Sequence, residues 1–388
     1  MIISPMRLLP LSALSPLELT RALVAFPSIT PKDEGCLAFL KDIFQGIGFV
    51  TTLLEPTNPD GPWNLCAACG SGEKTLVFLG HTDVVPEGTE PWDAFSPREE
   101  DGFLIGRGVA DMKGGIAAFV VASARFLQKY PHFSGKIVVL LTGDEEVGTP
   151  DGAQALLSWA IPRYGPFTSC LVGEPSSYRL LGDNIALGHR GSLDLHITAH
   201  GLQGHAASPE RARNPIPLLL RYLDKITQHV WEQDPGDFAA SHLEVTSIDV
   251  GNPVSNIIPS RAEARANIRF HLQHTSNDII RQMQTWATEM SPDLIIEFCA
   301  NGESFLCQDE HMTQALEKAI KSVLNITPQY STGGGTTDGR FISSHCPAIE
   351  FGMVCNTIHH KNERIPVADC ERLTQVYEIF LQNFFLES

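Results

Sequence analysis

Apolar runs alternate with helical patterns along the first half of the chain. Residues 75–79 and 136–141 are largely apolar segments that predict strands, and residues 113–130 have apolar positions spaced as on a buried helix. Strands that alternate with helices in this way are typical of a mostly parallel sheet with helices on both faces. We therefore predict an α/β domain, which begins with a helix capped by Ser15 and opened by Pro16.

The order of elements changes after about residue 190. The pattern predicts strands near 193–199, 243–250, 262–271 and 294–299, and helices near 216–231 and 277–290. In chain order this is the βαββαβ plan of ferredoxin-like α+β domains. Helical patterns at 312–324 and 370–385 then return to the first type. We predict a catalytic domain of residues 1–190 and 304–388, with an α+β domain inserted at 191–303.

Length and charge narrow the classes of partner. The 388 residues suit two domains, because a single core rarely grows beyond roughly 250–300 residues. A net charge of −17 argues against nucleic acid or an anionic membrane surface as a partner. The longest apolar run, residues 116–124, is far shorter than the ~20 residues that span a bilayer. We expect neither nucleic acid nor a membrane as partner.

The cysteines indicate a reducing compartment. Their number, nine in a long chain, does not suggest a disulfide framework. Cys66 and Cys69 have the spacing of half a zinc ribbon or of a redox pair, but no second pair stands at ribbon spacing, and ordinary thiols are the simpler interpretation. Pro5 and Pro10 interrupt the mildly apolar start of the chain, which is untypical of a secretory signal. We expect a cytoplasmic protein.

Potential metal ligands follow several of the predicted strands. His81 follows the run 75–79, the pair Glu145 and Glu146 follows 137–141, and Glu174 follows 171–172. Ligands of open α/β sheets bind at the carboxyl ends of the strands, so these side chains are expected to converge on one site. His359 comes shortly after the run 348–351 and fits the same pattern.

Asp111, in the glycine-rich stretch 106–115, completes a set of ligands for two ions. Two histidines and several carboxylates suit Zn²⁺, and also Co²⁺ or Mn²⁺. We predict that Asp111 bridges two ions, that His81 and Glu174 hold one, and that Glu146 and His359 hold the other. Two divalent ions would also neutralise carboxylates that otherwise repel one another.

Two acidic residues are left for other roles. Asp83 stands two residues after His81, where its carboxylate can hold the second ring nitrogen of the histidine. In the hydrolysis of an amide at the two ions, Glu145 is predicted to take a proton from the attacking water and to deliver it to the leaving amine nitrogen. The alternative for the pair Glu145 and Glu146 is a solvated surface position.

An acidic protein needs local cations to bind an anionic substrate. Arg190 and Arg269 are the candidates, because a guanidinium binds a carboxylate through two parallel hydrogen bonds. Arg340 is a third candidate or a structural residue. The glycine loop at 333–337 lacks the lysine of a nucleotide-binding loop. We predict that this loop, which includes Gly335 and Thr336, forms a backbone nest for a substrate carboxylate, with Thr336 donating its hydroxyl proton.

Several motifs, in this order, resemble the dinuclear zinc aminoacylase/carboxypeptidase family, the M20 metallopeptidases. They are GHTDVVP at 80–86, GRGVADMKGG at 106–115, DEE at 144–146, VGEPSS at 172–177, STGGGTTDGRF at 331–341 and TIH at 357–359. The resemblance implies the same ligand assignment, with Asp111 bridging and Glu145 as general acid and base, and a cis peptide after Asp111. It also implies an inserted lid and dimerisation domain.

Within this family, VGEPSS and STGGGTTDGRF favour an enzyme that removes the succinyl group from N-succinyl-LL-2,6-diaminopimelate. The same-class alternatives are an N-acetylornithine deacetylase and a dipeptide carboxypeptidase. A catalytically silent, metal-stabilised binding protein is the alternative from a different class.

The resemblance adds residues from the inserted domain. It implies that His205 reaches the active site of a partner subunit and stabilises the developing oxyanion, so that a homodimer is part of the mechanism; a capping histidine is the alternative. It places Ser192 and Asn256 near the substrate, although Asn256 is equally explained as a turn residue. His189 stands where the resemblance implies an arginine, and as a histidine it is a weaker partner for anions near neutral pH.

Overall fold

The computed structural model of the chain describes residues 15–236, 238–332 and 335–387, which divide into two compact units. Unit 1 contains the described residues of Met1–Leu187, Cys307–Ser331 and Thr337–Ser388. Unit 2 contains those of Gly188–Leu306 and Thr332–Thr336. The chain thus passes between the units four times. The first 14 residues, and Gly333 and Gly334 of the predicted nest, lie outside the described residues.

Unit 1 contains a mixed seven-stranded sheet in the order β1-β2-β6-β17-β7-β16, with β5 paired to β2. Its strands are β1 (Val50–Leu54), β2 (Asn64–His81), β5 (Ser134–Thr142), β6 (Ser169–Val172), β7 (Asn184–Ala186), β16 (Gln329–Ser331) and β17 (Ala348–Glu350). β5 lies between two arms of β2, since Leu141 pairs with both Leu65 and Gly80. β6 pairs parallel with the second arm of β2 and with β17, which confirms the mostly parallel sheet.

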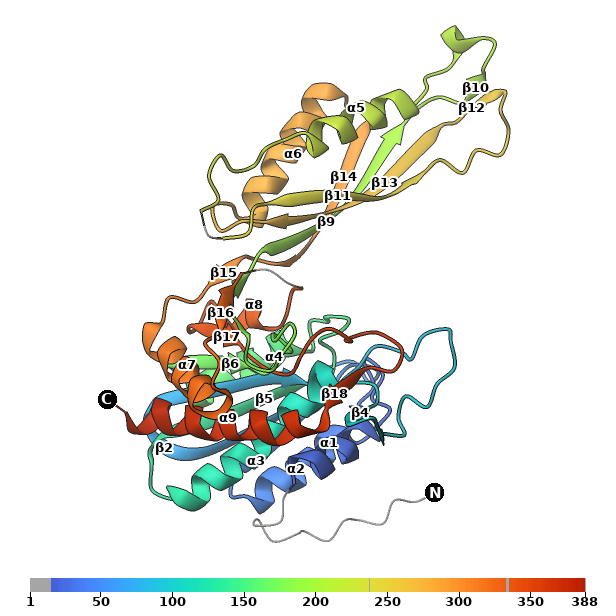
Figure 1. The fold of residues 1–388 in the computed structure, drawn as a ribbon. Helices are drawn as coiled ribbons and strands as arrows, with labels where there is room; N and C mark the ends of the chain where they lie inside the picture. The colour runs from blue at the N-terminus through green and yellow to red at the C-terminus, as the bar shows by residue number, and fades with distance from the viewer. Residues whose placement is uncertain (1–14, 237, 333–334, 388) are drawn as a thin grey trace. The chain divides into compact units, whose positions relative to one another are not determined.

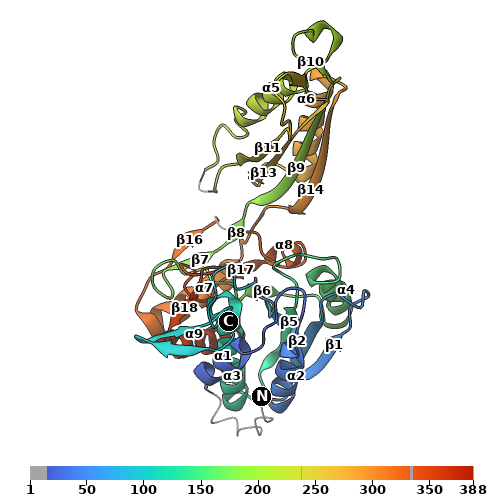
Figure 2. The ribbon, with the colours of Figure 1, turned by 90° about the vertical axis from the view of Figure 1, so that its right-hand side faces the viewer.

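Helices cover both faces of this sheet (Figure 1). They are α1 (Pro16–Val24), α2 (Cys36–Gly46), α3 (Gly114–Lys129), α4 (Ala153–Tyr164), α7 (Glu310–Leu324), α8 (Gly339–Ile342) and α9 (Val367–Leu386). α3 and α9 pack side by side on one face of the sheet, and Phe78 of β2 stacks on Phe119 of α3 with ring centroids 4.0 Å apart. α4 packs against β2 and β5 on the other face (Figure 2).

A small antiparallel sheet supports the loops that carry two of the predicted ligands. It is formed by β3 (Arg98–Glu100), β4 (Phe103–Ile105) and β18 (Arg364–Pro366). The chain leaves β4, passes through a wide turn, η2 (Val109–Lys113), and enters α3. The backbone N–H of Gly106 donates to the carbonyl of Glu363 at 3.0 Å, which joins the loop before η2 to the loop before β18.

Unit 2 has the βαββαβ order that the pattern predicted. Its main elements are β9 (Gly191–His200), α5 (Ile216–Thr227), β11 (His242–Asp249), β13 (Arg261–Phe270), α6 (Ser276–Met290) and β14 (Leu294–Gly302). The four strands form an antiparallel sheet in the order β11-β13-β9-β14, with α5 and α6 on one face (Figure 1). A second hydrophobic core fills the space between sheet and helices, where the Tyr222 hydroxyl donates to the Met283 carbonyl at 3.0 Å.

The shorter elements of unit 2 are two strand pairs and one turn. They are β8 (Gly188–His189) with β15 (Phe305–Leu306), β10 (Gly204–His205) with β12 (Ile257–Ile258), and η3 (Pro209–Arg211). The prediction of a helix up to Trp231 was wrong at its end, because α5 stops at Thr227 and the ring of Trp231 packs against His274 and Trp286. Among the described helices, none is long and apolar enough to cross a membrane.

Candidate metal centre

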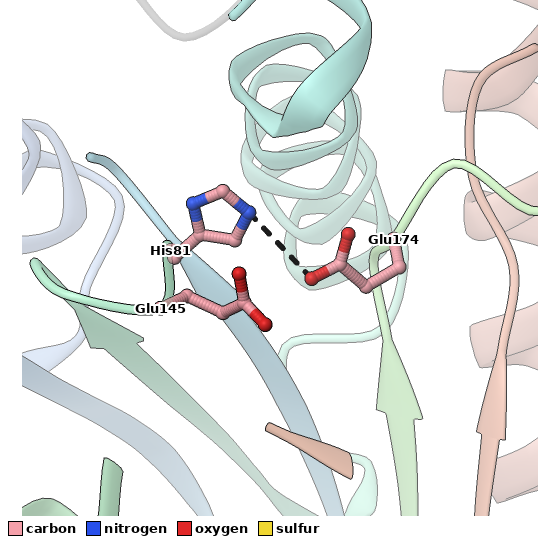
Figure 3. A group of neighbouring side chains, drawn as sticks. All are labelled: His81, Glu145 and Glu174. Carbon is pink, nitrogen blue, oxygen red and sulfur yellow. Dashed lines mark ion pairs between the residues drawn. The ribbon is translucent and has the colours of Figure 1, made fainter. Parts of the chain in front are cut away.

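Three of the predicted ligands, together with the predicted proton carrier Glu145, stand at the carboxyl ends of neighbouring strands in unit 1. His81 is the last residue of β2, Glu145 and Glu146 come shortly after β5, and Glu174 comes shortly after β6. Figure 3 shows the side chains of His81, Glu145 and Glu174 turned toward one another above these strand ends. The parallel pairing of β2 with β5 and β6 brings them together, as the sequence predicted.

The potential ligand atoms form two groups, and within each group they lie within 4.8 Å of one another. The first group is His81, Glu145 and Glu174, and the second is Asp111, Glu146 and His359. In the first, Nε2 of His81 is 3.5 Å from Oε1 of Glu174. In the second, Nε2 of His359 is 3.1 Å from Oε1 of Glu146. The groups combine imidazole nitrogens with carboxylate oxygens, which is a donor set for zinc and similar ions.

Asp111 faces both groups at once. Its Oδ1 is 3.1 Å from Nε2 of His81, and its Oδ2 is 3.3 Å from Nε2 of His359. One carboxylate oxygen is therefore turned toward each histidine. This is the placement that a ligand shared by two ions requires.

Glu145 lies inside the first group, although the sequence assigned it to proton transfer. Its side chain is largely buried, and Oε1 is 4.0 Å from Nη1 of Arg340. The other guanidinium end of Arg340 is 3.9 Å from Oδ1 of Asp338. A carboxylate in this position can ligate an ion or carry a proton. Arg340, which the sequence offered as a third substrate cation, stands beside this acid.

Asp83 holds two parts of the site together. Its Oδ1 is 3.4 Å from Nδ1 of His81, on the side of the ring opposite Asp111, and its backbone carbonyl is 3.0 Å from the same nitrogen. Its two carboxylate oxygens also accept hydrogen bonds from the backbone N–H groups of Glu145 and Glu146, each at 3.2 Å. Asp83 is almost fully buried, so it orients the histidine and the two glutamates as one unit.

The turn that carries Asp111 has unusual backbone geometry. The peptide bond from Asp111 to Met112 is cis, which confirms the expectation from the resemblance. Gly108, just before the turn, has a φ of +81°, and a Cβ there would lie 2.5 Å from Cγ1 of Val84. Only glycine fits this position without strain.

A buried carboxylate from a distant part of the chain supports the same turn. Glu363 accepts hydrogen bonds from the backbone N–H groups of Gly108 at 2.9 Å, Ala110 at 2.9 Å and Asp111 at 3.1 Å. Arg107, which is also buried, donates to Oε2 of Glu363 at 2.9 Å. Glu363 therefore fixes the backbone on which Asp111 stands.

The electrostatics of the two groups show how crowded the carboxylates are. Burial raises the pKa of Glu145 and of Glu174 well above the usual range of a glutamate, and neighbouring carboxylates add to the effect. Burial acts to lower the pKa of His81, but Glu174 and Asp111 outweigh it and raise that pKa well above its usual value. Hydrogen bonds with Asp111 and Glu146 raise the pKa of His359 to about 10. Divalent cations would satisfy this excess of negative charge.

The predicted carboxylate-binding residues lie in unit 2. Arg269, on β13, donates from Nε to Oδ1 of Asn267 at 3.1 Å and from Nη1 to Oγ1 of Thr336 at 2.6 Å. Arg190, between β8 and β9, donates to the carbonyl of Ala240 at 3.1 Å. The structure thus brings the side chains of Arg269 and Thr336 into contact.

The other predicted residues of unit 2 occupy different settings. Ser192 is buried on β9 and accepts hydrogen bonds from two asparagine side chains, whereas Gly335 is exposed. His205 is exposed on β10, where its Nδ1 accepts a hydrogen bond from the N–H of Ala207 at 3.0 Å. Asn256 stands just before β12, and its carbonyl accepts from the N–H of Ala206 at 2.8 Å. His205 and Asn256 are thus neighbours, while His189 is buried with its ring 5.7 Å from that of Phe305.

Sequence reasoning missed the residues that support the site. Glu363 and Arg107 were not singled out, and neither were Asp194 and Asn267 near Arg269. The available signal was a polar residue at alternate positions of β9 and β13, which places 192 and 194, and 267 and 269, on the same face of the sheet. All nine cysteines, each among the described residues, are free.

Comparison with known proteins gives a family match over most of the chain. The model of Peptidase family M20/M25/M40 matches residues 77–383. A succinyl-diaminopimelate desuccinylase from Methylorubrum extorquens is 44% identical over 382 residues, which cover 96% of this chain and 99% of the relative. Relatives from Cereibacter sphaeroides and Beijerinckia indica, at 39% and 41% identity over 96% and 95% of this chain and 99% and 98% of their own, have the same name.

Solved structures share the fold at low sequence identity. An M20 family metallo-carboxypeptidase from Sulfolobus solfataricus has a TM-score of 0.79 at 17% identity, over 95% of this chain and 99% of that one. A dinuclear metal binding peptidase of the M20 family from Bacillus subtilis has a TM-score of 0.70 at 12% identity, over 94% and 96%. These likenesses confirm an α/β fold with a central sheet flanked by helices.

Proposed function

The chain belongs to peptidase family M20/M25/M40, and from this premise we propose that it hydrolyses N-succinyl-LL-2,6-diaminopimelate to succinate and LL-2,6-diaminopimelate. The 44% identity to a relative named succinyl-diaminopimelate desuccinylase, over nearly the whole of both chains, carries the proposal. The reaction supplies precursors of lysine and of peptidoglycan. The proposed compartment is the cytoplasm, which the nine free cysteines among the described residues support.

Five side chains of unit 1 would hold two divalent ions. His81 and Glu174 belong to one ion, Glu146 and His359 to the other, and Asp111 to both; the two carboxylate oxygens of Asp111 turned toward the two histidines support this assignment. Zinc is the proposed metal, with cobalt or manganese as alternatives in either position. When bound, the ions polarise the amide carbonyl and lower the pKa of a water molecule.

Glu145 carries the proton in this reaction. It accepts a proton from the attacking water and delivers it to the amide nitrogen as the carbon–nitrogen bond breaks. Succinate then leaves as a carboxylate and diaminopimelate as an amine. The position of Glu145 supports this role, because its carboxylate lies among the proposed metal ligands His81 and Glu174, within reach of a water molecule held there.

The polar groups of unit 2 bind the carboxylates of the substrate. Arg269 and Thr336, which are hydrogen-bonded to each other, receive one carboxylate together with the backbone at Gly335. Arg190 is the second positively charged residue that binds a carboxylate of the substrate. Ser192 and Asn256 complete the set of substrate-binding residues.

His205 acts on the active site of a partner subunit within a homodimer formed through the inserted domain, residues 191–303. It donates a hydrogen bond to the oxyanion that develops in the transition state, and its exposure on unit 2 supports a role outside its own unit. Mixed dimers of Glu145→Ala and His205→Ala subunits should regain activity, because one of their two sites is intact. Mixed dimers that form but stay inactive would contradict the exchange.

A panel of substrates tests the proposed function. N-succinyl-LL-2,6-diaminopimelate should be hydrolysed with a higher kcat/KM than N-acetylornithine or a dipeptide. Preference for either of the latter would make the protein a deacetylase or a dipeptide carboxypeptidase of the same family. No amide hydrolysis by the zinc-loaded protein would instead indicate a metal-stabilised binding protein.

A further inference from the structure

A network of side-chain hydrogen bonds crosses three strands of unit 2. The carboxylate of Asp194, on β9, accepts from Nδ2 of Asn267 on β13 at 2.7 Å and from Nδ2 of Asn301 on β14 at 2.9 Å. Oγ of Ser192 accepts from the same two amides at 3.2 and 3.3 Å. The network ends next to Arg269, whose Nε donates to Oδ1 of Asn267 at 3.1 Å.

The chemistry of these groups allows only one arrangement. A carboxylate only accepts hydrogen bonds, so Asn267 must turn its NH₂ toward Asp194. Its carbonyl oxygen then faces the other way, toward the arginine, which only donates. Asp194 therefore determines which end of the Asn267 side-chain amide faces Arg269. It does so through Asn267, which lies between the two residues in the network.

The backbone supports this arrangement from both neighbouring strands. Asn267 is paired with Asp194 across the β13–β9 ladder, and Arg269 is paired with Ser192. On the other side, the register of β14 against β9 shifts between Ala300 and Gly302. This irregularity places Asn301 opposite the network, which is a common use of a bulge.

The guanidinium of Arg269 is held at two of its nitrogens. Asn267 accepts from Nε, and Thr336 accepts from Nη1 at 2.6 Å. An arginine loses side-chain entropy when a ligand orders it, and a fork that is already oriented avoids much of that loss on binding. Two-point binding of a carboxylate also requires that the plane of the fork be fixed.

We propose that Asp194 and Asn267 are positioning residues that orient Arg269 for a substrate carboxylate and so determine the preference for an anionic substrate. The proposal rests on the role that the proposed function gives to Arg269. Neither residue touches the reacting atoms, so their removal should raise KM and leave kcat nearly unchanged.

A reciprocal exchange of the two side chains tests the proposal. Asp194→Asn and Asn267→Asp should each raise KM for N-succinyl-LL-2,6-diaminopimelate by about 10- to 100-fold, the effect of misaligning a hydrogen bond to a charged group. The double variant Asp194→Asn/Asn267→Asp should recover much of this loss, because asparagine at 194 donates to aspartate at 267, which still accepts from Arg269. Losses that simply add in the double variant would overturn the proposal.

A matched control lies on the same sheet. Glu297, on β14, is exposed and pairs with the neighbouring His196. Glu297→Gln removes a charge from this region without touching the network, so it should leave KM within about twofold of the wild-type value. A rise in KM equal to that of Asp194→Asn would attribute the effect to net charge and would overturn the proposal.

Three analogues, each with one substrate carboxylate replaced by a neutral group, identify the partner of Arg269. Preference is measured as the ratio of kcat/KM for the natural substrate to kcat/KM for an analogue. In Asn267→Asp, this ratio should shrink about 10-fold or more for one analogue and stay unchanged for the other two. If no preference shrinks, the proposal is wrong. Arg269→Lys distinguishes a failure of this proposal from a failure of the proposed function. An unchanged KM in Arg269→Lys would mean that Arg269 does not bind the substrate, which would contradict the proposed function itself.

Discussion

The two units hold their functional side chains by different means. In unit 1, backbone N–H groups fix the carboxylates: Asp83 accepts from the peptide groups of Glu145 and Glu146, and Glu363 accepts from three peptide groups at the turn that carries Asp111. In unit 2, side chains fix Arg269, which donates to the amide oxygen of Asn267 and to the hydroxyl oxygen of Thr336. The positions of backbone N–H donors depend on the fold as a whole. An asparagine or aspartate on the face of a strand, by contrast, can be replaced by a single substitution.

This difference matches the tasks that the proposed function gives to the two units. A reaction centre shared by a whole family needs the same geometry in every member, and groups held by peptide N–H donors provide it. A carboxylate-binding site that distinguishes one substrate from another can be adjusted through side chains on a sheet face. We therefore expect substitutions around the metal ligands of unit 1 to change kcat and metal content, and those around Arg269 in unit 2 to change KM.

Glu145→Gln should give the largest effect. It removes the proton carrier but keeps the size of the side chain, so kcat should fall by about 10²–10⁴-fold. The metal content, measured by elemental analysis, should stay at two ions per chain. In Glu146→Gln, by contrast, one ion should be lost as well. Loss of an ion from the Glu145 variant would show that this residue is a ligand and would contradict its assigned role.

Metal binding should stabilise unit 1 rather than unit 2. At a free zinc concentration 100 times Kd, the free energy of unfolding should rise by about 2.7 kcal/mol for each ion bound, relative to the metal-free protein. Hydrogen exchange should slow in the backbone at 106–113 and 143–147, while the amides of β9, β11, β13 and β14 exchange at unchanged rates. Equal protection of both units would contradict the separation of their tasks.

Glu363→Gln tests the support under Asp111. The amide keeps one accepting oxygen but presents its NH₂ group to peptide N–H donors, so the turn should lose its fixed position. We expect the affinity for the metal, measured by calorimetry, to fall by about 10- to 100-fold. Glu371→Gln is the matched control, because Glu371 also pairs with an arginine, Arg125, but lies outside the site. An affinity equal to that of the control would rule out the supporting role.

The pair of Glu371 with Arg125 should give the smallest effect, on stability alone. Hydrogen bonds from Arg125 lower the pKa of Glu371 in the folded protein, so the folded state favours the charged carboxylate. The stabilisation is present above the unfolded pKa of about 4.3 and is lost as the pH falls through the lower, folded value. Because the pair is partly exposed, Glu371→Gln should cost no more than about 1 kcal/mol at neutral pH. A difference that persists below both pKa values would contradict this origin.

Much of the fold was predictable because the local pattern determines single elements. The apolar spacing at 113–130 indicated α3 (Gly114–Lys129), and the run at 136–141 indicated β5 (Ser134–Thr142). The placement of β5 between two arms of β2 was not predictable, because strand pairing depends on contacts that no local period records. The early end of α5 was missed for the same reason, since Trp231 packs against residues far along the chain.

The candidate site shows the same limit. His81, Glu145, Glu146 and Glu174 could be grouped from sequence because each follows a strand, and parallel strands end at one edge of the sheet. Glu363 could not be found in that way, since it acts through peptide groups that lie about 250 residues earlier in the chain. Prediction of the network around Arg269 would have required the register of three strands, which the alternation of polar residues alone does not determine.

The pairing of β6 with β17 has a consequence for how the protein is made. β6 ends at Val172, but β17 begins only at Ala348, after the whole of unit 2 and α7 have been synthesised. Until then a growing polypeptide on the ribosome carries β6 with one edge unpaired, so the backbone N–H and C=O groups of that edge can pair with other chains. Truncated forms that stop before residue 348 should therefore aggregate or depend on chaperones.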